Sequence, residues 1–239
     1  MNNLTLQEII NDSESIVFFG GAGVSTESGI PDFRSTDGLY NQKYDFPPET
    51  ILSHRYFVTH TADFYKFYRD KMIYSDAKPN KAHIALAKLE QSGKLKAVIT
   101  QNIDNLHQKA GSKTVYELHG SVYRNYCMDC KKAYGIEKIL NSTGVPTCEC
   151  GGIIKPDVVL YEENLNEDVI SGAVNAISNC DTLIIAGTSL TVYPAAGFVG
   201  YFKGRHLVLI NRDKTSYDKY AELVIREKVG EVLGEIVVE

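Results

Sequence analysis

Short apolar runs recur along the chain, bounded by glycine and polar residues. The first, Ile16 to Gly20, has the β-branched and aromatic composition of a buried strand. The next runs are nearly continuous in apolar residues and lack the alternation of a half-exposed strand, which is typical of strands buried in a parallel sheet. The further expected strands are residues 96–100, 181–187, 206–211 and 223–225.

Segments with helical periodicity lie between these runs. Asn80 can cap a helix whose Ala82, Leu86 and Leu89 recur at helical spacing and which Gly93 ends. Residues 167–179 show a similar pattern. Helices that alternate with buried strands predict a doubly wound parallel α/β sheet.

Two stretches interrupt this rhythm. Residues 36–76 are rich in aromatic side chains, and Phe64, Tyr68 and Met72 recur at a spacing of four, which predicts a helical insertion. The aromatic stripe favours a place in the core, and the lining of an apolar groove is the alternative. Residues 120–155 hold four of the five cysteines and predict a separate module.

The composition is ordinary for a globular protein and narrows the possible partners. A chain of 239 residues with 44% hydrophobic and 23% charged residues can bury one large core, with room for a small module. Its net charge of −5 argues against a nucleic-acid backbone as the main partner. We find no apolar run long enough to span a membrane and no signal-peptide pattern, so we expect a cytoplasmic protein.

A glycine-rich run, residues 21–34, follows the first expected strand. Its glycines predict a sharp turn that a ligand can approach, and Ser25 and Thr26 stand where a helix could begin, so the run indicates a cradle for a nucleotide diphosphate. Glycine turns without a nucleotide remain the alternative. A dehydrogenase fingerprint would need glycine in place of Thr26 and an acid near Asn41.

The cysteines form two tight pairs. Cys127 and Cys130 are followed after a loop by Cys148 and Cys150, a spacing that favours a tetrahedral structural zinc site. Two disulfides, or a redox pair, are the alternatives. We interpret Cys180, which precedes a strand, as a small buried hydrophobic residue.

Polar residues follow three of the expected strands. In an open parallel sheet, ligands bind beyond the carboxyl ends of the strands, where residues 101–107, residues 187–189 and Asn211 would lie. Asp104 could equally cap the next helix. His119 could act as a base near neutral pH or have only a structural role.

Taken in order, these motifs resemble those of the sirtuins, the NAD-dependent protein lysine deacylases. The matching segments are GAGVSTESGIPDFR at 21–34, TQNIDNLH at 100–107, LHG at 118–120, the cysteine pairs at 127–150, KPDVVLYEE at 155–163, GTSLTVYPAA at 187–196 and LVLIN at 207–211.

The resemblance implies a division of the chain into two parts. A Rossmann-like NAD-binding domain would comprise residues 1–35, 77–119 and 156–239. A smaller domain would combine a zinc ribbon at 120–155 with the helical insertion at 36–76. The default expectation for the oligomeric state is a monomer.

The resemblance also assigns site residues. His119 and Asn102 would be catalytic, with His119 as general base on a ribose hydroxyl, and Asp104 would bind the carboxamide of the nicotinamide. The substrate lysine would pass Val159 and Tyr161, and its peptide would pair with Glu162 and Val192. NAD would contact Ala22, Thr26, Phe33, Arg34, Gln101, Asn102, Ile103, Asp104, Thr188, Ser189, Asn211, Lys228 and Val229.

The implied reaction consumes NAD as a co-substrate. The amide oxygen of acetyl-lysine displaces nicotinamide, and the products are nicotinamide, O-acetyl-ADP-ribose and the deacetylated lysine of a protein or peptide. ADP-ribosyl transfer to protein and acyl-lysine binding without turnover are the rival activities. A conventional dehydrogenase is disfavoured by Thr26 and Asn41.

Two departures from the family pattern affect specificity. Tyr161, Glu162 and Glu163 replace the usual Phe-Gly-Glu, which could favour basic residues next to the acyl-lysine. Tyr68 stands where acidic-acyl members carry Arg. Because a buried succinyl carboxylate would then lack a partner, we expect neutral acyl groups to be preferred.

Overall fold

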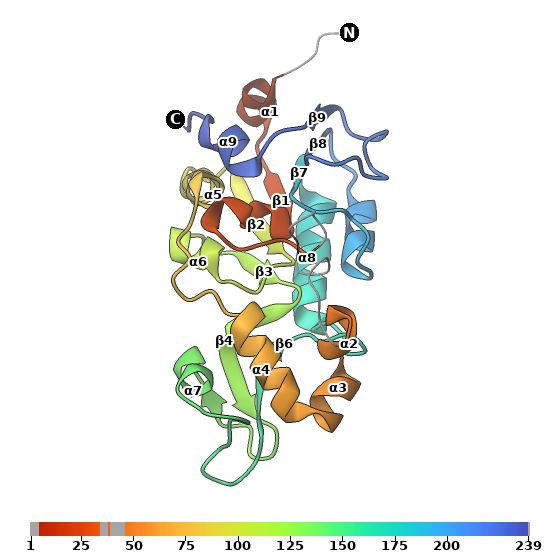
Figure 1. The fold of residues 1–239 in the computed structure, drawn as a ribbon. Coiled ribbons are helices and arrows are strands. Elements are labelled where there is room, and N and C mark those ends of the chain that lie inside the picture. The colour runs from red at the N-terminus through yellow and green to blue at the C-terminus, as the bar shows by residue number, and fades with distance from the viewer. Residues whose placement is uncertain (1–4, 34–37, 39–45, 239) are drawn as a thin grey trace.

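A computed structural model describes residues 5–33, 38 and 46–238. Within these residues the main element is a six-stranded sheet in which every neighbouring pair is parallel. Its order is β3 (Val115–Glu117), β2 (Leu95–Thr100), β1 (Ile16–Gly20), β7 (Thr182–Ala186), β8 (His206–Ile210) and β9 (Leu223–Ile225). The predicted doubly wound sheet is confirmed (Figure 1).

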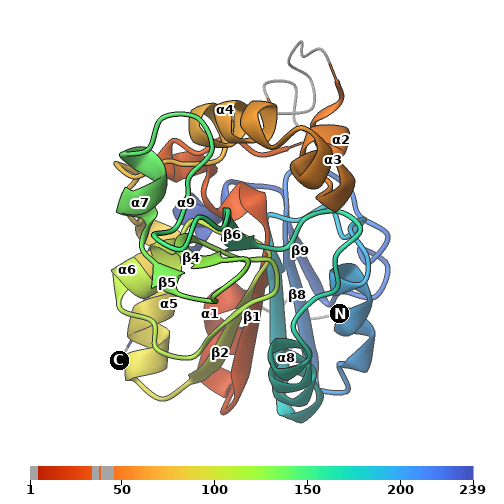
Figure 2. The same cartoon turned by 90° about the horizontal axis from the view of Figure 1, so that it is seen from below.

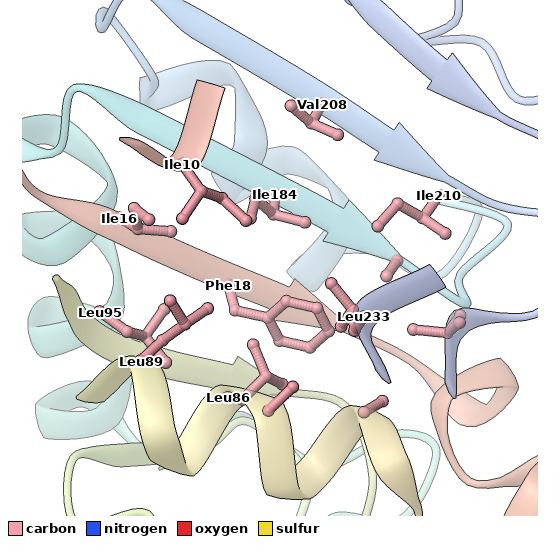
Figure 3. Packing of buried hydrophobic residues seen from close by; sticks show 14 of the residues in the cluster. Ile10, Ile16, Phe18, Leu86, Leu89, Leu95, Ile184, Val208, Ile210 and Leu233 are labelled. Carbon is pink, nitrogen blue, oxygen red and sulfur yellow. The ribbon is translucent and has the colours of Figure 1, made fainter. Parts of the chain in front are cut away.

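The central strands are buried because both faces of the sheet are covered. Successive side chains point to opposite faces, so Phe18 of β1 packs on one side and Val17 and Phe19 pack on the other. Figure 3 shows Phe18 beside Leu86 and Leu233. The helices on the Phe18 face are α1 (Leu6–Asp12), α5 (Lys81–Gln91) and α9 (Val229–Gly234), and the opposite face is covered by α8 (Glu167–Asn179) and the 3₁₀ helix Ala195–Tyr201.

The two predicted helices, α5 and α8, lie on opposite faces of the sheet, and each begins at a side-chain cap. Asn80 accepts a hydrogen bond from the Ala82 N–H at 2.9 Å, and Asn166 accepts from the first turn of α8. Ala173 and Ile177 form the buried stripe of α8, and Cys180 behind it is 4% exposed, as expected for a small hydrophobic residue.

The helix start expected at Ser25 and Thr26 is a single 3₁₀ turn and not the start of an α-helix. Two single-turn 3₁₀ helices, Ala22–Val24 and Thr26–Ser28, follow β1 instead. Gly29 then ends the second 3₁₀ helix with a φ of 83°, a conformation that favours glycine. The turn therefore presents its side chains on a compact loop rather than along a helix.

A second, smaller part packs against the carboxyl end of the large sheet (Figures 1 and 2). It holds a three-stranded antiparallel sheet in the order β5 (Ala133–Tyr134), β4 (Gly120–Cys127) and β6 (Ile154–Val158), so β6 ends beyond residue 155. Its helices are α2 (Pro48–Ile51), α3 (His54–Thr59), α4 (Thr61–Lys71) and α7 (Ile136–Leu140), and the short α6 (Leu106–Ala110) follows β2 in the large part.

The aromatic stripe of the insertion belongs to the core of this smaller part. Phe64, Tyr65 and Tyr68 of α4 are fully buried and share a cluster with Cys127 and Ile154. The Tyr65 hydroxyl donates to the Ile154 carbonyl, which ties α4 to β6. Among the described helices, none combines the length and apolar character needed to cross a membrane.

Candidate active site at the carboxyl end of the large sheet

A cavity of about 400 Å³ lies where β1, β2, β7 and β8 end. Residues from both parts line it, including Ile103 after β2 and Met72, Val122 and Val158 of the smaller part. The carboxyl end of a parallel sheet is the place where ligands bind in doubly wound folds. The cavity is therefore the candidate active site.

Nearly all residues that were expected to act in catalysis or to bind NAD or the peptide line this cavity. Arg34 lies outside the described residues. The expected residues that line the cavity are Ala22, Thr26, Phe33, Gln101, Asn102, Ile103, Asp104, His119, Val159, Tyr161, Glu162, Thr188, Ser189, Val192, Asn211, Lys228 and Val229.

The glycines after β1 also allow close packing against a second loop. Gly23 donates its N–H to the Gly187 carbonyl at 2.8 Å, and a Cβ at Gly23 would lie 2.7 Å from the Gly187 Cα. A Cβ at Gly21 would lie 2.8 Å from the Gly187 oxygen. These glycines let the loops after β1 and β7 pack backbone to backbone and so build one wall of the cavity.

A chain of three polar side chains crosses the cavity wall. The Asn102 amide donates to the Ser25 hydroxyl at 3.0 Å, and that hydroxyl donates to Asp104 Oδ2 at 2.6 Å. Asp104 Oδ1 accepts the Leu106 N–H at 2.9 Å and so satisfies the first N–H of α6, although the N-cap residue of that helix is Asn105. Burial raises the pKa of Asp104, and the hydrogen bonds from Ser25 and Leu106 offset only part of that. Ser25, 1% exposed, was not among the predicted site residues.

Gln101, the first residue after β2, joins the loops after β1 and β2 to the loop after β7. Its Oε1 accepts the Thr188 hydroxyl at 2.8 Å, and the Thr188 Oγ1 in turn accepts the Leu190 N–H at 3.2 Å. Ser189 lies beside them, with its hydroxyl 2.8 Å from that of Thr191. The ends of β1, β2 and β7 are thus held in one hydrogen-bonded unit.

His119 stands at the junction between the two parts. Its Nδ1 lies 2.9 Å from the Gln101 carbonyl oxygen, and its own carbonyl accepts the Val159 N–H at 3.1 Å. Since a carbonyl only accepts, Nδ1 carries the proton and Nε2 keeps its lone pair. Among the described residues, Nε2 has no hydrogen-bond partner. Burial lowers the pKa of His119, so the ring is a neutral base.

The segment with Val159 and Tyr161 is fixed to the start of α3. Tyr161 donates its N–H to the Leu52 carbonyl and accepts the His54 N–H, both at 2.9 Å. Glu162 has a φ of 76°, where the family pattern has glycine, and its Oε2 accepts the Arg55 N–H at 3.0 Å. Glu162 therefore keeps the glycine-like bend and adds a carboxylate at the cavity.

The four predicted metal ligands meet in the smaller part. The Sγ atoms of Cys127, Cys130, Cys148 and Cys150 all lie within 4.8 Å of one another. The Cys127–Cys150 and Cys130–Cys148 Sγ distances are 3.5 and 3.6 Å. A tetrahedral Zn–S₄ site has S–S distances of about 3.8 Å, and a disulfide would need about 2.05 Å.

The surroundings of the cluster also fit a structural metal. The Tyr134 hydroxyl donates to Cys148 Sγ at 3.0 Å, and a Cβ at Gly152 would lie 2.7 Å from Cys127 Sγ. Zinc with four thiolates has no open position for a substrate, so the site would act on stability. The disulfide alternative is wrong for this structure, in which all five cysteines are free.

Comparisons with known proteins agree with this geometry. The Sir2 family model matches residues 21–194. A protein of Clostridium acetobutylicum named NAD-dependent protein deacetylase is 61% identical over 97% of this chain and 96% of its own length. One of Cutibacterium acnes with the same name is 52% identical over 99% of this chain and 98% of its own length.

Solved structures of similar proteins share the fold. A Sir2 variant with a deacetylated p53 peptide and 3′-O-acetyl ADP-ribose has a TM-score of 0.87, is 41% identical and covers 95% of this chain and 94% of its own. A Sir2 homologue with NAD has a TM-score of 0.88, is 39% identical and covers 96% of this chain and 90% of its own. On these matches of sequence and fold, the chain belongs to the Sir2 family.

Proposed function

We propose that this protein is an NAD-dependent protein lysine deacetylase. It transfers the acetyl group of acetyl-lysine to ADP-ribose and releases nicotinamide, O-acetyl-ADP-ribose and free lysine. The observation that carries the proposal is the position of His119, a neutral base whose tautomer is set by the Gln101 carbonyl, on the cavity that the polar chain of Asn102, Ser25 and Asp104 also lines.

The lining residues fit an extended dinucleotide. The nicotinamide end belongs near Phe33, Ile103 and Asp104, where the apolar wall meets the hydrogen-bonded carboxyl group. The raised pKa of Asp104 suits a group that hydrogen-bonds a neutral carboxamide. The adenosine end belongs near Asn211 and Lys228, with Ala22, Thr26, Gln101, Thr188, Ser189 and Val229 between or beside the two ends.

His119 acts after the nicotinamide bond has broken. The acetyl oxygen bonds to the ribose carbon that loses nicotinamide, and a ribose hydroxyl then attacks the acyl carbon. One water molecule is consumed as the bond between the acyl carbon and the lysine nitrogen breaks, which releases lysine and O-acetyl-ADP-ribose. His119 Nε2 accepts the proton of that hydroxyl, while the hydrogen bond from Nδ1 to Gln101 keeps the ring in place. General-base catalysis of this kind contributes roughly 10²- to 10⁴-fold to the rate.

Acylated lysine in a protein or peptide is the second substrate. The solved Sir2 structures include one with a propionylated peptide, which is 40% identical to this chain with a TM-score of 0.83. Val159, Tyr161, Glu162 and Val192 line the part of the cavity assigned to this substrate. The two-domain division, a monomeric state and a cytoplasmic location stay predictions.

Nicotinamide release tests the function. Purified protein with NAD and an acetylated peptide should release nicotinamide and form O-acetyl-ADP-ribose, both followed by mass spectrometry. His119→Ala should fold and bind NAD yet lose roughly 10²- to 10⁴-fold in deacetylation rate. His60→Gln, a change outside the cavity, is the matched control.

The same assay separates the rival activities. A protein acceptor that gains the mass of ADP-ribose without an acyl substrate would indicate ADP-ribosyl transfer. Tight binding of acetyl-peptide without nicotinamide release would indicate a binding module. Unchanged deacetylation by His119→Ala would remove this residue from the role of base.

A further inference from the structure

Lys155 of β6 is a buried lysine whose ammonium group has a complete set of acceptors. Its side chain is 6% exposed. Its Nζ donates to Glu163 Oε2 at 3.0 Å, to the Val158 carbonyl at 3.1 Å and to the Pro156 carbonyl at 3.3 Å. An ammonium group has three donors, and here each one has an acceptor.

Glu163 completes the arrangement from the other end of the segment. Its Oε2 also accepts the Leu160 N–H at 2.9 Å, and its Oε1 lies 2.9 Å from His54 Nδ1. Burial raises the pKa of Glu163, but the hydrogen bonds from Leu160 and His54 and the charge of Lys155 outweigh it, so the pKa lies below its usual value. Glu163 is therefore a carboxylate that faces an ammonium.

This ion pair holds the backbone on both sides of Val159. Lys155 binds the carbonyl of Val158, and Glu163 binds the N–H of Leu160. Val159 itself lines the cavity and donates its N–H to the His119 carbonyl. The pair thus closes residues 155–163 into a loop whose middle faces the expected acyl-lysine and touches the expected base.

We propose that Lys155 and Glu163 are positioning residues for the acylated peptide. They hold the segment from Val158 to Tyr161 at the distance from His119 that the peptide needs. Within the part of the chain that the structure describes, they have no comparable contact with the loops assigned to NAD. This inference rests on the proposed function. A positioning role differs from a role in stability alone, because removal of the ion pair should then weaken peptide binding selectively in protein that is still folded.

A double substitution separates the two roles. Lys155→Met alone would leave a carboxylate without its partner and cost stability, whereas Lys155→Met together with Glu163→Met removes both charges, a change that buried ion pairs often tolerate. The double variant keeps the fold but loses the hydrogen bonds to Val158 and Leu160. We expect its KM for acetyl-peptide to rise about tenfold, equivalent to about 1.4 kcal/mol. Its affinity for NAD without peptide should change less than about twofold.

Lys94→Met is the matched control. Lys94 Nζ also donates to three carbonyls, those of Ile10, Asn11 and Ser13, but it precedes β2, at the amino end of the strands and away from the cavity. Its removal should lower the unfolding temperature and leave the KM values for peptide and NAD unchanged.

Glu163→Gln is the variant to use if the double variant does not fold. It keeps the side-chain volume and one acceptor oxygen, so we expect a smaller rise in the KM for peptide.

The outcomes are distinct. Peptide KM unchanged in a folded variant, or equal losses of peptide and NAD affinity, would overturn the positioning role. A wild-type protein that turns over no acetyl-peptide would contradict the proposed function instead. The same variants would then be compared for binding of a fluorescent acetyl-peptide, and equal affinities would again overturn the inference.

Discussion

The Nδ1 atom of His119 lies 2.9 Å from the carbonyl oxygen of Gln101, the first residue after β2. Burial lowers the pKa of His119 below its usual value of 6.5, and the hydrogen bond to Gln101 offsets only part of that. A base must be neutral, so kcat/KM for deacetylation should be constant above pH 6.5 and fall as the pH drops through the lowered pKa. A pH–rate profile checks this, and an acid limb centred above pH 7 would contradict it.

An ion cluster around His206, at the amino end of β8, predicts that the stability of the protein depends on pH. His206 Nδ1 lies 2.7 Å from Glu222 Oε2, and its Nε2 lies 3.1 Å from Asp12 Oδ2. Burial lowers the pKa of His206, but the hydrogen bonds to both carboxylates outweigh it and raise the pKa above 6.5. The stabilisation is thus complete below pH 6.5 and is lost as the pH rises through the folded-state pKa.

Urea unfolding of the wild type and of His206→Gln between about pH 5.5 and 8.5 measures this contribution. The difference in the free energy of unfolding should shrink as the pH rises. A difference that stays constant, or grows, over this range would show that His206 does not gain its proton on folding.

Substitution of a cysteine in the four-cysteine cluster should lower the stability of the protein without changing its catalytic rate constant. A structural zinc bound by thiolates contributes on the order of 10 kcal/mol of apparent binding free energy at neutral pH. Cys127→Ser should therefore lose zinc and unfold at a lower temperature, while the fraction that stays folded keeps its kcat. Cys180→Ala, a buried cysteine outside the cluster, should lose stability but keep its zinc.

Acyl selectivity follows from the burial of Tyr68. The side chain is fully buried and stacks on Phe64 with ring centroids 5.4 Å apart, so this position supplies no cation to an acyl group. Lys71 lines the cavity but lies 3.0 Å from Asp70. Succinyl-peptide kcat/KM should be at least about tenfold below that of acetyl-peptide, since an unpaired carboxylate is costly to bury. Lys71→Met should leave this ratio unchanged, and comparable turnover of the two peptides would refute the prediction.

The loops after β1 and β7 are in close contact, so the methyl group that an alanine at Gly187 would add should be destabilising. Gly187 has a φ of 59°, and a Cβ there would lie 2.5 Å from the Val24 nitrogen. Gly187→Ala should cost at least about 2 kcal/mol of unfolding free energy and weaken NAD binding, because the backbone must shift. Gly200→Ala, with nothing within 4 Å of the added atom, is the control for thermal and chemical unfolding.

Strands and helices with strong local signals were predicted well. β7 and β8 are continuous apolar runs, and α5 and α8 each have an Asn cap followed by an apolar stripe. The three-residue β3 was missed because Val115 to Glu117 is too short and too polar to stand out. The helix start expected at Ser25 and Thr26 is only a single 3₁₀ turn, and the preceding Gly23 packs against Gly187, a contact far along the chain that local sequence does not show.

The sequence by itself determined which chemical groups the site holds. A histidine, an amide, a carboxylate and four thiolates follow recognisable strands and turns, and those signals are local. The tertiary structure decided which atoms meet. Ser25 and Asp104 are 79 residues apart, and their hydrogen bond exists because parallel pairing of β1 and β2 brings the two strand ends together. Parallel pairing of β2 and β3 likewise brings His119 to the Gln101 carbonyl, which sets its tautomer, and the folding back of residues 155–163 joins Lys155 to Glu163.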